Sequence, residues 1–216
     1  MLEYSTQSTF SEVVSHRRSN YAIGKAVKDD ASLDVRQILE FALQNTPSAF
    51  NSQPAQLLLL EGAAHDRLWT IVQEAFADSV KPESYAKAKP KIDSFAAGWA
   101  TILFFIDTAV TDSLIEQFPT YAHSFPNWAR ESTGMLQYVI WDALDDAGFG
   151  VSLQHYNPLI DRRVSAEWNI PAQWALVSQM VFGSREADPL PKTFIVPNEH
   201  LQLIAETIAP LYRKRR

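Results

Sequence analysis

Two adjacent arginines begin a segment whose residue types suit anion binding. Arg17 and Arg18 are followed by Ser19 and Asn20, which add a hydroxyl and an amide. Guanidinium groups bind phosphate or carboxylate through paired hydrogen bonds, so the segment predicts an anion site. A cationic end to the preceding helix explains the same residues, because cations favour a helix C-terminus, and both interpretations stay open.

A second polar segment, Pro47–Pro54, has the sequence PSAFNSQP. Its two prolines limit the flexibility of a loop that carries hydroxyl and amide side chains and one aromatic ring. We expect this loop either to read the edge of a heterocycle through hydrogen bonds or to form an ordinary serine and asparagine turn.

The third segment, Gly148–Pro158, has the sequence GFGVSLQHYNP and starts with glycines that let a backbone approach another group closely. An expected strand then delivers Gln154, His155 and Tyr156 into a bend. The near-neutral titration of histidine suits acid–base chemistry. A hydrogen-bonded packing role is the alternative for His155, because the sequence offers it no fixed partner.

Composition narrows the possible partners. The formal net charge of −6 and the pI of about 5.4 argue against nucleic acid and anionic membranes. Cysteine is absent and the five histidines have no metal-ligand spacing, so neither a disulfide nor a metal site is expected. The chain begins without a secretion signal and has no apolar run of membrane-spanning length, which predicts a cytoplasmic protein.

The common nucleotide and hydrolase motifs are also absent. The sequence has no Gly-x-Gly-x-x-Gly, no Gly-Lys-Ser/Thr loop and no Gly-x-Ser-x-Gly elbow. A phosphate-bearing cofactor would therefore be held mainly by side-chain cations, and no catalytic nucleophile or carboxylate pair is expected.

Hydrophobic spacing predicts the elements that must position these segments. A capping box at Thr9 and Glu12 begins the first helix, and Asn157-Pro158 is expected to begin another. Further helices are expected at 35–43, 68–76, 128–147 and 201–208, a basic helix or loop at 81–91, and strands at 56–60, 101–106, 151–153 and 174–182.

The order of these elements favours a single α+β domain over residues 1–216. Strands are scattered among helices without regular alternation, which favours a sheet flanked by helices over a doubly wound parallel sheet. No repeat, low-complexity segment or linker interrupts the chain. Its six tryptophans indicate either a large aromatic core or a site for planar ligands.

Taken together, the three segments resemble the nitroreductase family of FMN enzymes, and in particular its short bacterial and fungal branch related to fatty-acid repression. The resemblance covers nearly the whole chain. The matching stretches are Arg17–Ser19, PSAFNSQP at 47–54, GWATILFFID at 98–107, Trp128 with 134–137, GFGVSLQHYNPLID at 148–161 and QMVFG at 179–183.

The resemblance implies a nitroreductase-like fold, in which helices flank a central, mainly antiparallel sheet and two chains form an intertwined homodimer. Each FMN would lie at the subunit interface, with PSAFNSQP supplied by the partner. The implied activity transfers hydride from NAD(P)H through flavin N5 to nitroaromatic or quinone-like acceptors in ping-pong fashion, with a role in the oxidative stress response. A flavin-binding redox sensor that acts through a protein partner and a reductive enzyme for another small aromatic are the alternatives.

The family also implies roles for individual residues. Arg17 and Lys192 would hold the FMN phosphate, and Arg18 and Ser19 would contact the ribityl and pyrimidine side. The residues implied along the partner's flavin are Pro47, Ser48, Ala49, Asn51 and Gln53, and those implied along the ring system are Leu153, Gln154 and His155, with a backbone N–H near N5. The candidates to line the acceptor cavity are Phe50, Trp99, Phe125 and Trp128, for which core packing is the alternative.

Three positions depart from the family pattern. Tyr21 stands where many members have a lysine close to flavin N1, Phe194 stands where a second basic residue is common, and Val181 replaces a proline. Arg18 and Arg185 are the expected substitutes for the missing cations.

Overall fold

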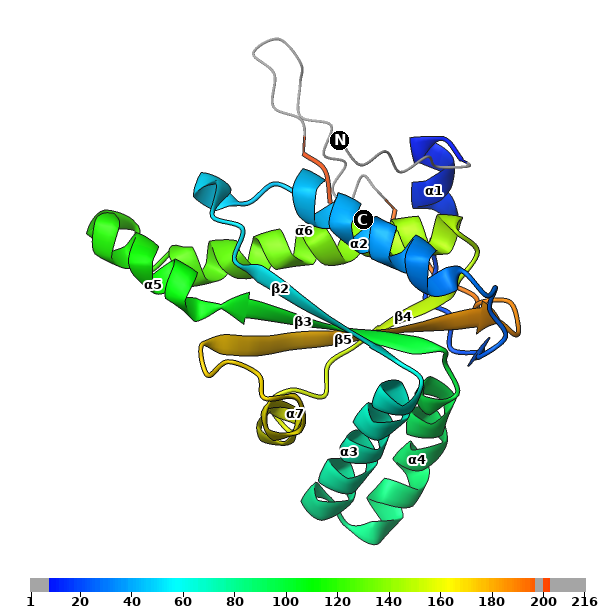
Figure 1. The fold of residues 1–216 in the computed structure, drawn as a ribbon. Helices are drawn as coiled ribbons and strands as arrows, with labels where there is room; N and C mark the ends of the chain where they lie inside the picture. The colour runs from blue at the N-terminus through cyan, green and yellow to red at the C-terminus, as the bar shows by residue number, and fades with distance from the viewer. Residues whose placement is uncertain (1–7, 197–199, 203–216) are drawn as a thin grey trace, which may run out of the picture.

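A five-stranded sheet forms the centre of the fold (Figure 1). The computed structural model describes residues 8–196 and 200–202 of the 216-residue chain. Within them the strands run in the order β1-β5-β3-β2. Strand β4 also pairs with β5, on the edge opposite β3. All pairings of these strands are antiparallel, which confirms the expected mainly antiparallel α+β class. The strands are β1 (Ile23–Gly24), β2 (Ala55–Glu61), β3 (Ala100–Asp107), β4 (Gly150–Gln154) and β5 (Trp174–Arg185).

Helices cover both faces of this sheet. In Figure 1, α2 and α6 lie on one face, and α3, α4 and α7 lie on the other. The short α1 and the helix α5 lie toward opposite ends of α6. The helices are α1 (Phe10–His16), α2 (Ala31–Asn45), α3 (Ala63–Ser79), α4 (Pro82–Ala96), α5 (Thr108–Gln117), α6 (Phe125–Asp146) and α7 (Asp161–Trp168), with the 3-10 turns η1 (Ala49–Asn51) and η2 (Pro119–Tyr121).

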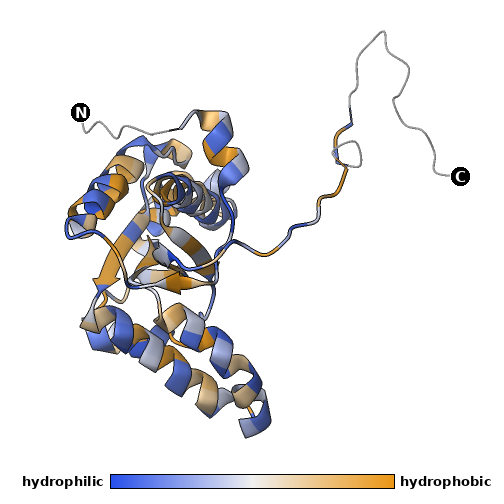
Figure 2. Cartoon of the chain, turned by 90° about the vertical axis from the view of Figure 1, so that its right-hand side faces the viewer, coloured by the Kyte–Doolittle hydropathy of each residue, from blue (hydrophilic) through white to orange (hydrophobic). Residues whose placement is uncertain are grey.

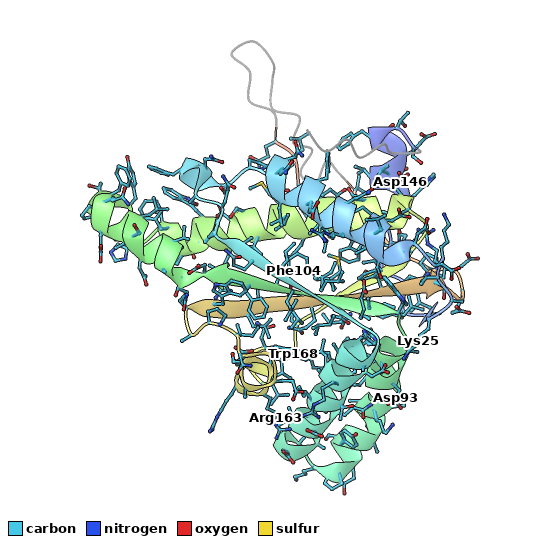
Figure 3. All side chains as sticks on the ribbon, in the orientation of Figure 1. Lys25, Asp93, Phe104, Asp146, Arg163 and Trp168 are labelled. Carbon is cyan, nitrogen blue, oxygen red and sulfur yellow. The ribbon has the colours of Figure 1, made fainter. Side chains whose placement is uncertain are left out.

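The central strand β3 divides the core into two layers. Its residues from Ala100 to Ile106 are all buried, which explains why all of them except Thr101 are apolar. Ile102 and Phe104 pack into the layer under α2 and α6, and Figure 3 shows Phe104 in that space. Leu103 and Phe105 point the other way and join the core formed with α3, α4 and α7.

Several expected boundaries differ from those observed. The helix expected to open at Asn157-Pro158 begins at Asp161, and the Asn157-Pro158 peptide is cis and lies in the connection after β4. Asparagine followed by proline is also a turn signature, and the fully buried Ile160 fixes that connection to the core just before α7. The long helix α6 begins at Phe125, with Pro126 in its first turn, rather than at 128.

Two elements were not expected from hydrophobic spacing. The helix α5 follows β3 directly because Asp107 ends the strand and accepts a hydrogen bond from the Ala109 N–H at 3.0 Å. The strand β1 contains two residues, and its pairing with β5 defines it. The basic stretch at 81–91 is helical within α4. Most of the helix expected at 201–208 lies outside the described residues.

Candidate functional site

The arginine segment follows α1 and runs against the edge of β4. The Asn20 N–H donates to the Val151 carbonyl at 2.9 Å, and Ser19 forms a parallel bridge with Val151. The buried Asn20 side chain also donates to the Ala187 carbonyl at 2.9 Å, and Arg18 donates to the carbonyl of Leu190. These bonds hold the chain that follows β5 alongside the arginine segment.

This arrangement brings the predicted cations together. Arg17, Arg18 and Ser19 line a pocket of about 380 Å³ together with Lys192. Tyr21 also lines this space, which we call the arginine pocket; its remaining lining residues are Leu190, Pro191 and Thr193. The pocket therefore combines two guanidiniums, an ammonium and a hydroxyl, a donor set that suits a phosphate-bearing ligand.

Two residues of helix α6 contact the Arg17 side chain. The Arg17 guanidinium lies 4.7 Å from the centroid of the Trp141 ring, and its Nε is 3.8 Å from Oδ1 of Asp142. The Arg17 side chain is 19% exposed, so its position is fixed while part of it still faces the pocket. Burial raises the pKa of the Asp142 carboxyl, while a hydrogen bond from Tyr138 and the charge of Arg17 act in the opposite direction.

Arg185 does not take the role of a substitute cation in the arginine pocket. Its Nη2 donates to the Asp145 carbonyl at 2.7 Å and its Nε donates to the Phe149 carbonyl at 3.0 Å. It also forms an ion pair with Asp145 Oδ1 at 3.0 Å. All of these acceptors lie at the end of α6 and just before β4, so Arg185 stabilises the connection between these two elements. Arg18 remains in the pocket, as expected.

The backbone of the PSAFNSQP loop adopts an unusual conformation at three residues. Phe50, Asn51 and Gln53 have positive φ angles of 58°, 52° and 48°, a region that residues other than glycine rarely adopt. The Gln53 N–H donates to Ser48 Oγ at 2.9 Å and closes the turn. Strained backbone of this kind clusters at ligand sites, which makes the loop a candidate part of a binding site.

This loop forms a second pocket, which is separate from the arginine pocket. Pro47, Ser48 and Gln53 line a space of about 250 Å³ together with Ser132 and Leu136 of α6. None of its lining residues also lines the arginine pocket. Ala49 and Asn51 lie in the turn η1 beside it. One chain therefore keeps the two groups of predicted cofactor residues apart.

Buried amides shape the end of β4. Gln154 is buried and donates to Ser152 Oγ at 2.7 Å. Gln179 of β5 accepts a hydrogen bond from the Tyr156 N–H at 2.7 Å, which fixes the bend after His155. The His155 side chain is exposed, and Leu153 is half-buried. The structure thus holds the backbone of this segment firmly, while the imidazole faces solvent.

Three of the four predicted cavity residues meet in one aromatic cluster. The Phe50 ring stacks on Trp128 at 6.2 Å and meets the Phe125 ring edge-on at 5.4 Å. Phe118 and Tyr121, at either end of η2, complete the cluster at 5.1 and 6.2 Å from Phe50. Sequence reasoning missed these two, although a phenylalanine and a tyrosine that flank a short polar connection were a usable signal. Phe50, Phe118 and Tyr121 are exposed, so the cluster presents aromatic surface to solvent.

Trp99 lies elsewhere, and its predicted place in this cavity is not supported within one chain. Its ring stacks on Phe149 at 6.1 Å and meets Phe182 edge-on at 5.6 Å. Trp99 starts the connection into β3, far along the sheet from the aromatic cluster. Core packing, the alternative interpretation, accounts for these contacts.

The described residues offer neither a metal site nor a membrane-spanning helix. They contain no group of three or more histidine and acidic side chains that could hold a metal ion. None of the described helices has both the length and the apolar content needed to cross a bilayer.

Comparison with known proteins identifies the family. The profile of the nitroreductase family matches residues 16–184. The chain belongs to the nitroreductase family. Nitroreductase FRM2 of Saccharomyces cerevisiae is 33% identical over 192 residues, which cover 88% of this chain and 95% of the yeast protein.

Solved structures agree with this assignment. Nitroreductase CinD from Lactococcus lactis, determined in complex with chloramphenicol, superposes with a TM-score of 0.82 at 41% identity and covers 92% of this chain and 100% of its own. A nitroreductase with bound FMN from Desulfitobacterium hafniense has a TM-score of 0.67 at 17% identity, over 90% of this chain and 97% of its own. The second likeness concerns the fold alone. The resemblance to the nitroreductase family and the expected mainly antiparallel sheet flanked by helices are thus confirmed.

Proposed function

We propose that this nitroreductase-family oxidoreductase is FMN-dependent and transfers electrons from NAD(P)H to nitroaromatic or quinone-like acceptors. The observation that carries the proposal is the convergence of Arg17, Arg18 and Lys192 with Ser19 around one pocket, because this donor set suits a phosphate-tailed cofactor. The FMN in the Desulfitobacterium hafniense structure supports the choice of flavin. The complex of CinD with 4-nitrophenol supports the acceptor class.

The residues of this chain would bind and orient the cofactor. Arg17, held by α6, and Lys192, which lines the same pocket, would bind the phosphate, and Arg18 and Ser19 would face the ribityl and pyrimidine side. The rigid end of β4, at Leu153–His155, would lie along the ring. Bound FMN would supply the hydride chemistry at N5, with NAD(P)H and the acceptor using the same space in turn.

We further propose that the chain acts as a single-domain homodimer whose partner completes each site. The separation of the two pockets in one chain supports this idea, because PSAFNSQP would then complete the site of the other subunit. Apolar side chains exposed on α1 and α6, among them Phe10 at 82%, Met135 at 43% and Tyr138 at 40%, suit burial between two chains. Beyond the contacts of Ala187 and Leu190 with the arginine segment, the described chain extends away from the body of the fold (Figure 2), with Phe194 79% exposed.

The decisive experiment uses the freshly purified protein. We expect a flavin absorbance spectrum and FMN release on denaturation, followed by steady-state NAD(P)H oxidation that a nitroaromatic or a quinone accelerates. A colourless protein that does not bind added FMN would contradict the proposal. A yellow protein that oxidises NAD(P)H no faster with any acceptor would instead indicate a flavin-binding sensor.

A further inference from the structure

Lys91 of α4 lies against Tyr21, one of the residues that line the arginine pocket. Its Nζ is 5.7 Å from the ring centroid of Tyr21 and 5.9 Å from that of Phe95. The two rings lie 6.0 Å apart, so together they support one ammonium group. Because Tyr21 also lines the arginine pocket, this contact places the Lys91 charge beside the pocket wall.

The segment between Arg17 and Tyr21 joins the two helical layers. Arg17 packs on Trp141 of α6, and Tyr21 packs on Phe95 of α4, which covers the opposite face of the sheet. Arg17 and Lys192 concentrate positive charge where a phosphate would bind. The part of the pocket that Tyr21 lines is therefore available to the rest of a phosphate-tailed cofactor, beyond its phosphate.

The charge of Lys91 is not neutralised by a neighbouring carboxylate. Lys89, on the same helix, pairs with Asp93 at 2.7 Å, and Figure 3 labels Asp93 on α4. Lys25, also labelled there, pairs with Asp66 at 2.6 Å. Among the described residues, Lys91 takes part in no ion pair, and only its two ring contacts position the ammonium. Lys91 is exposed in the single chain, and its charge is therefore still available to a ligand.

We propose that Lys91 acts as an electrostatic tuning residue for the redox cofactor. This inference rests on the proposed function. Hydride arrival adds negative charge to the ring of a bound flavin, and a preorganised cation nearby favours the charged state over the oxidised one. Lys91 therefore raises the reduction potential of bound FMN, while the phosphate cations determine how tightly FMN is held.

The test compares Lys91→Gln, Lys91→Arg and Lys89→Gln in the FMN-loaded protein. Lys91→Gln removes the charge, Lys91→Arg keeps it, and Lys89→Gln removes an equal charge from the same helix at a site that Asp93 already neutralises. Three quantities are measured for each protein: the Kd of oxidised FMN, from quenching of its fluorescence, the midpoint potential of bound FMN, by equilibration with a reference dye, and the KM for NADPH.

We expect Lys91→Gln to weaken binding of reduced FMN relative to oxidised FMN by about tenfold, the size of a one-unit pKa perturbation by a nearby charge. For a two-electron couple this lowers the midpoint potential by about 30 mV. Lys91→Arg should stay near the parent value, and so should Lys89→Gln. The Kd of oxidised FMN should change little in any of them.

Each other outcome overturns the inference. An unchanged potential in Lys91→Gln, or an equal fall in Lys89→Gln, would show that Lys91 has no specific effect on the ring. A raised KM for NADPH with an unchanged potential would place Lys91 on the phosphate of the nucleotide instead. These results leave the proposed function intact, whereas a parent protein that binds no FMN would overturn both.

Discussion

Replacing Arg17 by alanine is expected to weaken FMN binding more than any loss of stability explains. The guanidinium lines the arginine pocket, and its side chain is already 19% exposed and held by Trp141 and Asp142. A hydrogen bond to a charged group contributes about 1.5–3 kcal/mol. The Kd for FMN should therefore rise roughly 10- to 100-fold.

The neighbouring carboxylate makes this prediction sharper. Removing Arg17 leaves Asp142 buried without its cation, and because burial already raises the pKa of Asp142, the loss of Arg17 should raise it further. Some of the damage in Arg17→Ala could thus come from Asp142 rather than from the lost phosphate contact. The double variant Arg17→Ala/Asp142→Asn removes the stranded charge and separates the two causes.

The assay is titration of FMN into the apo forms of the parent, the single variant and the double variant, with urea unfolding of each at one protein concentration. The double variant should recover unfolding free energy but not FMN affinity. Arg67→Ala, which breaks exposed ion pairs with Glu74 and Glu167, serves as a matched control and should bind FMN normally. Full recovery of FMN affinity in the double variant would refute the phosphate role of Arg17, as would an Arg17→Ala protein that binds FMN like the parent.

Further predictions concern the loop and the buried polar network. Ser48→Ala removes the hydroxyl that closes the loop turn and should raise the Kd for FMN severalfold without changing the urea midpoint. Thr101→Val leaves Trp69 Nε1 and His65 Nδ1 without the hydroxyl that lies 3.1 and 3.0 Å from them, and should cost about 3 kcal/mol of unfolding free energy. Thr133→Val, equally buried but bonded only within its own helix, should cost less than about 1 kcal/mol. Burial lowers the pKa of His65 below its ordinary value of 6.5. The contribution of His65 to stability is therefore complete above pH 6.5 and is lost as the pH falls through the folded-state pKa. A urea midpoint that does not fall between neutral and acidic buffer would contradict this prediction.

The sequence predicted the elements whose hydrophobic pattern is local. The run at 102–106 is apolar throughout because β3 is buried on both faces, and its short length and its β-branched and aromatic residues favour a strand over a buried helix. The strand β1 could not be found this way, because only its pairing with Ser184 and Arg185 makes its two residues a strand. The helix α5 was missed because it buries only Thr111 and so shows little apolar periodicity.

The same contrast applies to the site. Arg17 and Arg18 could be named because they lie in a segment that matches the family, and Lys192 because the resemblance implies a phosphate-binding cation at its position. The structure places all three around one pocket. Lys91 could not be named, since four lysines between 81 and 91 look alike in the sequence. Packing of α4 against Tyr21 distinguishes Lys91 from the others, and that contact joins residues 70 positions apart.

The helix α6 explains why one chain would not complete the proposed site alone. Its first turns carry Phe125 and Trp128, its middle carries Ser132 beside the PSAFNSQP loop, and its last turns carry Trp141 and Asp142 behind Arg17. At about 1.5 Å per residue, Ser132 and Asp142 lie about 15 Å apart along the helix axis. A straight helix cannot fold back to bring both ends to one ligand. A two-fold axis that pairs α6 with an antiparallel copy would bring the first half of one helix beside the second half of the other, and the proposed homodimer requires that arrangement.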